Sequence, residues 1–261
     1  MKNILILIAV LVIAFIGFSF FMGASTPNEE MEEEEEAMTS DEISITPISH
    51  ATMVLTWDDQ IIYTDPVGGA EVFAGQPEPT LVLVTDIHGD HLDADTLSAV
   101  ATGSVTIIAP QAVVDALPEE FADRVTVLAN DQSTQKAGLS ITAIPMYNLP
   151  ESEDSRHVKG RGNGYVLEKG GQRVYIAGDT QGIPEMRALT GIDIAFVPMN
   201  LPYTMDVEEA ADAVLEFKPA KVYPYHYRTP EGLSDVAKFK ELVNAGDLEI
   251  EVVQLEWYPQ E

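Results

Sequence analysis

The chain has 261 residues, a formal net charge of −29, 46% hydrophobic residues and no cysteine. The hydrophobic fraction is sufficient for a packed core, and the strong negative charge excludes nucleic acid and anionic lipid head groups as partners of the folded part. The absence of cysteine excludes disulfides, thiolate metal ligands and cysteine nucleophiles.

Residues 1–25 predict a transmembrane anchor. Residues 4–22 carry no charge, and a helix of that length extends for about 28 Å, close to the hydrocarbon thickness of a bilayer. Lys2 precedes the run and acidic residues follow it, so the rest of the chain is expected outside the cytoplasm. A cleaved signal peptide, which would give a secreted protein, is the alternative because small residues follow at Gly23 to Ser25.

Residues 26–42 are acidic, with five consecutive glutamates at 32–36, and contain few large apolar groups. The like charges of such a segment repel one another, so we expect a disordered tether between the anchor and a folded domain over 43–261. The sequence does not indicate an oligomeric state.

The first half of the folded domain predicts a sheet that opens with antiparallel strands. Short β-rich runs occupy 43–47, 52–57, 61–64, 81–85 and 105–109. Helical patterns at 93–101 and 111–117 flank the last of these strands.

The second half alternates strands with helices in the same way. Strands are expected at 139–145, 164–168, 174–177, 192–198, 221–225 and 249–257, and helices at 207–217 and 235–245. Two half-sheets with outer helices predict an α/β fold, a four-layer αββα sandwich.

The segment Asp86-Ile87-His88-Gly89-Asp90-His91 packs four potential metal ligands into six residues directly after a buried-strand pattern. Two other segments also place a ligand type at a strand end, Asp179 after 174–177 and His226 after 221–225. Side chains from distant strand ends can meet at one edge of a sandwich, and imidazole with carboxylate suits a divalent first-row cation.

These segments resemble the metallo-β-lactamase fold superfamily of metal-dependent hydrolases, and within it the ascorbate-6-phosphate lactonase-like branch. The resemblance covers about residues 43–257 and includes the early Asp65-Pro66. It implies the αββα sandwich and a site for one or two divalent ions, with zinc the first expectation and manganese, iron or magnesium the alternatives. The metal ligands that it implies are Asp86, His88, Asp90, His91, Asp179 and His226.

The chain departs from the family motif at two positions. The family reads His-x-His-x-Asp-His, and Asp86 stands in place of the first histidine. The next family histidine would fall near Tyr147-Asn148, where no histidine stands. By family analogy Asp90, His91 and His226 hold one ion, Asp179 bridges, and Asp86 and His88 remain for the other, with Asn148 or His157 as a replacement ligand. The added oxygen donors favour a harder metal than usual.

A basic, glycine-rich loop at 156–164 stands out in so acidic a chain. His157, Lys159 and Arg161 are candidates for neutralising an anionic substrate, together with Tyr147 and Asn148 as substrate contacts. A solvent-facing loop is the alternative interpretation. His50 and Asp65 are expected to support the metal ligands through hydrogen bonds.

The pattern as a whole predicts hydrolysis of a small anionic ester, lactone or phosphodiester by a metal-activated water. Asp90 would orient the water and His157 would stabilise the developing oxyanion. A membrane-tethered metal-binding or interaction module with the same fold and little turnover is the alternative, because fold does not guarantee activity.

Overall fold

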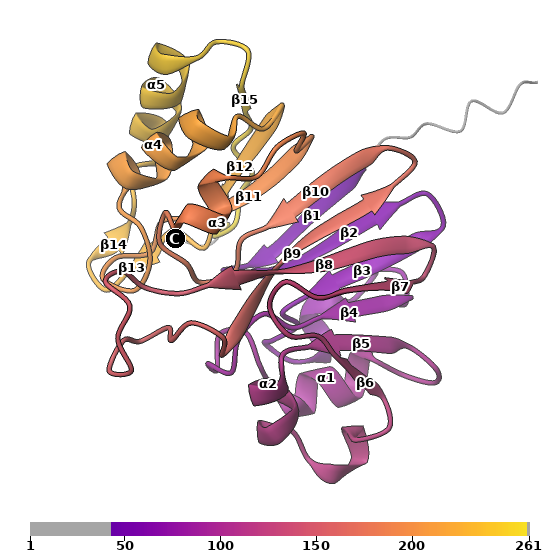
Figure 1. Ribbon diagram of the computed structural model, residues 1–261. Helices are drawn as coiled ribbons and strands as arrows, with labels where there is room; N and C mark the ends of the chain where they lie inside the picture. Colours follow the sequence, from indigo (N-terminus) through magenta and orange to yellow (C-terminus); the bar gives the residue numbers. More distant parts are fainter. Residues whose placement is uncertain (1–42, 260–261) are drawn as a thin grey trace, which may run out of the picture. The chain divides into compact units, whose positions relative to one another are not determined.

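Two β-sheets packed face to face form the centre of the fold (Figure 1). The computed structural model describes residues 43–259, so the anchor and the tether expected over 1–42 lie outside the described residues. Within 43–259, no helix combines the length and the apolar character that crossing a membrane requires.

The first sheet has the strand order β1-β2-β3-β4-β5-β6. Its strands are β1 Ser44–Ser49, β2 Thr52–Trp57, β3 Gln60–Thr64, β4 Leu81–Leu83, β5 Thr106–Ala109 and β6 Val125–Val127. The first three strands are antiparallel, as expected, and β3 to β6 run parallel. The parallel connections carry the 3-10 turns η1 Ala70–Phe73 and η2 Glu119–Phe121 and the helices α1 Ala94–Val100 and α2 Gln111–Ala116.

The second sheet has the order β15-β12-β11-β10-β9-β8-β7. Its strands are β7 Ser133–Lys136, β8 Leu139–Met146, β9 Gly162–Lys169, β10 Gln172–Ile176, β11 Ile194–Pro198, β12 Lys221–Tyr225 and β15 Glu251–Val252. Three helices accompany it, α3 Pro184–Arg187, α4 Val207–Phe217 and α5 Val236–Gly246, with a small hairpin of β13 Arg228–Thr229 and β14 Gly232–Leu233.

The side chains of β2 alternate between two hydrophobic clusters, and this alternation shows how the layers pack together. Met53, Leu55 and Trp57 belong to the core shared by both sheets, whereas Val54 joins a separate cluster with Leu97 of α1. Successive side chains of a strand point to opposite faces, so β2 packs against the second sheet on one side and against helices on the other. The residues between 43 and 259 therefore have the expected αββα order.

The expected element boundaries hold best where a cap marks them. Helix α4 covers 207–217 as predicted, because the Asp206 side chain accepts a hydrogen bond from Glu209 N (2.7 Å). The expected strand at 249–257 was wrong in length, since β15 contains only Glu251–Val252. The apolar residues that suggested a longer strand include Trp257. This side chain lies outside any strand, is fully buried and packs against Tyr225.

Candidate metal centre

All five histidines of the chain lie in one site, at which β3, β4, β10 and β12 end. Four aspartates share it. Ion-pair distances of 3.9 Å or less connect the members, which are His50, Asp65, Asp86, His88, Asp90, His91, His157, Asp179 and His226. The loop after β4 meets the second sheet here, because Asn163 N donates a hydrogen bond to Thr85 O (2.9 Å).

The first group of converging ligand atoms comes from Asp90, His91, Asp179 and His226. Asp179 Oδ1 lies 3.2 Å from His226 Nε2, and Asp179 Oδ2 lies 3.3 Å from His91 Nε2. The two Nε2 atoms are themselves 3.2 Å apart, and both rings are fully buried. Two imidazole lone pairs and a carboxylate that face one point in a buried site are the donors that a divalent cation needs.

The opposite edge of each ring fixes its orientation. His91 Nδ1 lies 2.8 Å from Asp65 Oδ2, and Asp65 also accepts hydrogen bonds from the backbone N and the Oγ1 of Thr85 (2.7 and 2.6 Å). Asn200 lies 3.1 Å from His226 Nδ1. Asp65 therefore occupies the supporting position that the sequence predicts, and it leaves His91 Nε2 to face the cluster.

Electrostatics in this group favour a positive charge between the carboxylates. Burial lowers the pKa of His91, but the carboxylates of Asp179 and Asp65 outweigh it and raise this pKa well above its ordinary value. Burial raises the pKa of Asp179, yet the charges of His226 and His91 hold it well below the usual range. A divalent cation between the carboxylates would supply the same positive charge.

The second group contains Asp86, His88 and His157 and adjoins Asp179. His157 Nε2 lies 3.2 Å from Asp179 Oδ2 and 3.8 Å from Asp86 Oδ2. His88 Nδ1 lies 2.6 Å from Asp86 Oδ2 without the angle of a hydrogen bond. His88 Nδ1, His157 Nε2 and Asp179 Oδ1 are buried atoms with no hydrogen-bond partner, and one cation in each group would satisfy them.

The structure brings His157 into the ligand cluster and leaves Asn148 outside it. The Asn148 Oδ1 accepts a hydrogen bond from His157 N (2.8 Å), and its Nδ2 donates to Tyr203 O (2.8 Å). Asn148 therefore holds the loop that carries His157. The His157 side chain is buried, with Nδ1 against Tyr203 O (3.2 Å) and Nε2 toward the carboxylates. Its expected contact with a substrate stays a prediction.

The basic side chains chosen from the sequence do not line the pocket. Lys159 pairs with Glu185 (2.7 Å) and lies over the Tyr147 ring, whose hydroxyl also donates to Glu185. Arg161 points inward, with Nε 3.3 Å from Asp86 Oδ1 and Nη2 3.3 Å from Asp86 Oδ2. Tyr147, Lys159 and Arg161 thus each have an acidic partner, and their contact with a substrate stays a prediction.

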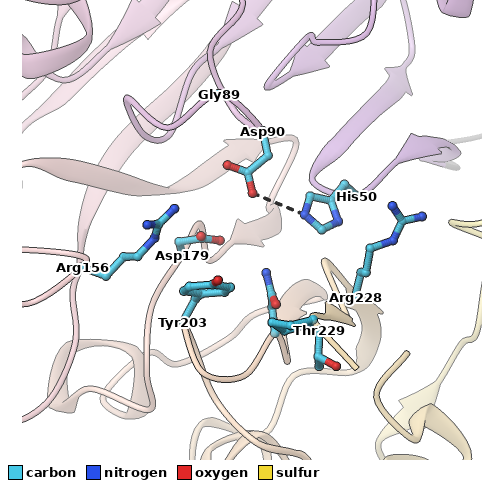
Figure 2. A pocket seen from close by; sticks show the side chains of 10 residues that line it. His50, Gly89, Asp90, Arg156, Asp179, Tyr203, Arg228 and Thr229 are labelled. Carbon is cyan, nitrogen blue, oxygen red and sulfur yellow. Dashed lines mark ion pairs between the residues drawn. The ribbon is translucent and has the colours of Figure 1, made fainter. Parts of the chain in front are cut away.

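A pocket of about 550 Å³ opens over the first ligand group. It is lined by His50, Gly89, Asp90, Arg156, Asp179, Asn200, Tyr203, Arg228, Thr229 and Pro230, as Figure 2 shows. Sequence reasoning missed Arg228, which lies in the two-residue strand β13, and Tyr203, which lies in a turn, and neither segment has a periodic signal. Arg156 stands in the basic loop beside His157, so its charge in an acidic chain was an available signal.

His50 lies between the pocket and the ligands, as expected for a supporting residue. Its Nε2 is 3.3 Å from Asp90 Oδ2, and its Nδ1 is 2.7 Å from the Tyr258 hydroxyl. Burial lowers the pKa of His50, and Asp90 opposes this only in part. His50 can thus donate to Asp90 through Nε2 as a neutral ring.

Comparison with known proteins identifies relatives. Residues 44–226 match the profile described as a beta-lactamase superfamily domain. A UPF0173 metal-dependent hydrolase of Thermococcus onnurineus is 33% identical over 204 residues, which is 75% of this chain and 90% of that protein. A counterpart in Pyrococcus horikoshii is 32% identical over 206 residues, again 75% of this chain and 90% of that protein.

Solved structures agree with this comparison. One described as a metal-dependent hydrolase, from Parabacteroides distasonis, is 38% identical, with a TM-score of 0.73 over 83% of this chain and 94% of that one. Igni18, a metallo hydrolase from Ignicoccus hospitalis, shares the fold at 23% identity, with a TM-score of 0.68 over 82% of this chain and 94% of that one.

Proposed function

The chain belongs to the β-lactamase superfamily as a UPF0173-type metal-dependent hydrolase, and we propose that it hydrolyses a small anionic ester, lactone or phosphodiester at a two-ion centre. The observation that carries this proposal is the convergence of buried, unpaired ligand atoms on two adjacent points that share Asp179.

The two ligand groups have matching chemistry. Each contributes two imidazoles and one carboxylate of its own, and Asp179 lies against both. This donor set suits zinc, which we expect, and it also suits iron or manganese, since the second group has an aspartate where the family motif has a histidine. His157 would be the second imidazole of the group that holds Asp86 and His88.

Bound divalent ions supply a Lewis acid and lower the pKa of a water molecule toward neutrality. The protein's own contribution is orientation. Asp90 is the most exposed carboxylate of the cluster, with its side chain 38% accessible, and it lines the pocket beside His50, whose Nε2 lies 3.3 Å from Asp90 Oδ2. Asp90 can therefore accept a hydrogen bond from the attacking water and fix its direction.

The ligand histidines are kept in place by their outer contacts. Asp65 and the Tyr203 carbonyl face the Nδ1 atoms of His91 and His157 respectively. These acceptors keep the two Nε2 atoms directed at the two groups and reduce the reorganisation that the reaction requires.

The test is metal analysis of the full chain combined with turnover of matched ester, lactone and phosphodiester panels. We expect metal-dependent turnover that is lost on chelation and restored by zinc, iron or manganese. Asp90→Asn should lower kcat by about 100-fold or more, the size of a typical general acid–base contribution, and kcat is measured per bound ion because Asp90 is also a member of the first group. A chain that binds ions stoichiometrically but turns over no member of the panels would favour the binding-module alternative.

A further inference from the structure

A tyrosine from the segment after β15 reaches the metal centre. Tyr258 lies outside the stretch 44–226 that matches the family profile, and it is only 4% exposed. Its hydroxyl lies 2.7 Å from His50 Nδ1, and His50 Nε2 lies 3.3 Å from Asp90 Oδ2, a contact that Figure 2 shows. A continuous line of polar atoms therefore joins this segment to the most exposed carboxylate of the centre.

Backbone and ring contacts hold His50 in this line. His50 stands in the turn between β1 and β2 with a φ of +59°, and its carbonyl oxygen accepts a hydrogen bond from His226 N (3.2 Å). The centroid of its ring lies 3.8 Å from that of the His226 ring and 5.9 Å from that of the Tyr258 ring. These contacts restrict rotation of the His50 ring, so its two nitrogens keep their separate partners.

The chemistry of the partners fixes the direction of these contacts. A carboxylate can only accept a hydrogen bond, so the favourable state of His50 beside Asp90 has a proton on Nε2. In a neutral imidazole one nitrogen carries the proton and the other a lone pair, which places the lone pair of His50 on Nδ1. The Tyr258 hydroxyl, 2.7 Å away, is then the donor to that lone pair.

The other contacts of Tyr258 agree with this direction. Burial raises the pKa of the Tyr258 hydroxyl, and the backbone N–H groups of Arg228 and Tyr227 act against this rise. A backbone N–H can only donate, so it occupies a lone pair of the hydroxyl oxygen and leaves the hydroxyl proton for His50. The Tyr227 ring also packs edge-on against the Tyr258 ring, with 4.9 Å between the centroids, and this contact restrains the side chain.

We propose that Tyr258 is a positioning residue for hydrolysis: its hydroxyl donates to His50 Nδ1, which keeps the ring proton on Nε2, toward Asp90. This proposal rests on the proposed function and adds the residue that sets the hydrogen bonding of Asp90. A donor fixed beside Oδ2 restrains the carboxylate plane, so Asp90 meets the attacking water in one orientation. With the opposite tautomer, the lone pair of His50 Nε2 would face the carboxylate and repel it.

Nitrogen-15 NMR of the histidine-labelled full chain, with zinc added, tests the direction of the contact. The His50 signals are assigned by their loss in His50→Ala. In the wild type, His50 should carry its proton on Nε2 and none on Nδ1. Tyr258→Phe should shift the Nδ1 resonance because this nitrogen loses its donor.

Tyr175→Phe is the matched control. Tyr175 is also buried, but its hydroxyl has no hydrogen-bond partner among the described residues, so the His50 resonances should stay unchanged. A proton on His50 Nδ1 in the wild type, or an unchanged Nδ1 resonance in Tyr258→Phe, would overturn the proposal.

Turnover of the most rapidly hydrolysed panel member shows whether the contact serves the reaction. Tyr258→Phe should lower kcat by about fivefold or more, the effect of one hydrogen bond, and change KM by less than about twofold. In a His50→Ala background the same substitution should have no further effect, because Tyr258 acts through His50. Unchanged kcat in Tyr258→Phe, or equal losses with and without His50, would overturn the proposal. The expected Nδ1 shift with no turnover by the wild type refutes only the hydrolase.

Discussion

The contact behind His91 decides which of its two ring nitrogens can bind a metal. Asp65 accepts the hydrogen bond of His91 Nδ1, and its carboxylate also accepts two hydrogen bonds from Thr85. A carboxylate can only accept, so it keeps the proton on His91 Nδ1 and leaves Nε2 as a donor to the ion.

Asp65→Asn tests this arrangement. An amide NH₂ turned toward His91 Nδ1 would move the ring proton to Nε2, which then could not ligate. The affinity for metal should fall by about 10- to 100-fold, as measured by competition with a chromogenic chelator. Asp93→Asn is the control, because Asp93 caps α1 and asparagine caps a helix equally well. Unchanged affinity in Asp65→Asn would show that Asp65 does not set the His91 tautomer.

Asp86 and Arg161 form a pair of opposite charge beside the second ligand group. Burial works to raise the pKa of Asp86, but the close approach of His88 and the nearby positive charges, Arg161 among them, outweigh it and lower that pKa. The additional negative charge of an aspartate at this position is thus balanced by a guanidinium from the loop of His157.

Arg161→Ala should destabilise the metal-free protein by about 1–3 kcal/mol, since Asp86 is fully buried and loses a charged partner. A divalent ion in the second group would supply the missing charge, so the loss should shrink when metal is saturating. By linkage the variant should bind its second ion more tightly than the wild type does. Denaturant unfolding with and without chelator measures both effects. Weaker metal binding in Arg161→Ala would mean that Arg161 orients Asp86 as a ligand instead of competing with the ion.

At the scale of the elements, the site depends on turns that follow the strands closely. Gly178, between β10 and Asp179, has φ +65°, and an added Cβ would lie 2.7 Å from Met146 Sδ and 3.1 Å from Asn163 O. The turn also passes under Tyr225, whose hydroxyl lies 2.9 Å from Gly178 N. Glycine is required here both for the backbone conformation and for the close approach.

Gly178→Ala should therefore lower the free energy of unfolding by about 2–4 kcal/mol, from left-handed strain plus overpacking, and should reduce bound metal by displacing Asp179. Gly170→Ala is the matched control. Gly170 has a similar φ of +61° but no atom within 4 Å of an added Cβ, so only the strain is introduced. Thermal unfolding and metal content of the two variants separate the contributions. Equal effects of both substitutions would show that the contact with Met146 is unimportant.

The predictable part of the site follows strand periodicity. Asp86, Asp179 and His226 lie within three residues of the ends of buried strands, and side chains at such positions emerge at the end of a sheet. Lys159 and Arg161 stand on a loop between β8 and β9, where no periodicity indicates which side chain turns inward. The direction of that loop is set by tertiary contacts, among them Asn148 with His157.

The helices and strands were likewise predictable where the sequence has a periodic pattern or a cap. Long strands and the capped helix α4 were predictable because local chemistry marks them. The hairpin of β13 and β14 contains two residues per strand, which is too short for an alternating pattern, and Arg228 was overlooked with it. Val125–Val127 and Ser133–Lys136 were missed because they are short, half-buried strands at sheet edges.

For the whole molecule, the central claim is that folding gathers five histidines and four aspartates into a centre for two ions that share Asp179. The two sheets contribute ligands from opposite halves of the chain, so neither half can form the centre alone. Cations that lie between the buried carboxylates would offset the cost of burying them.

The most direct test is metal stoichiometry, measured by mass spectrometry on the loaded full chain. The wild type should bind two ions per chain, His157→Ala one, and Asp179→Ala fewer than His157→Ala, because the Asp179 carboxylate faces both groups. His50→Ala should keep two, since His50 contacts Asp90 but belongs to neither group. Two ions retained in His157→Ala, or equal losses in Asp179→Ala and His50→Ala, would contradict the account.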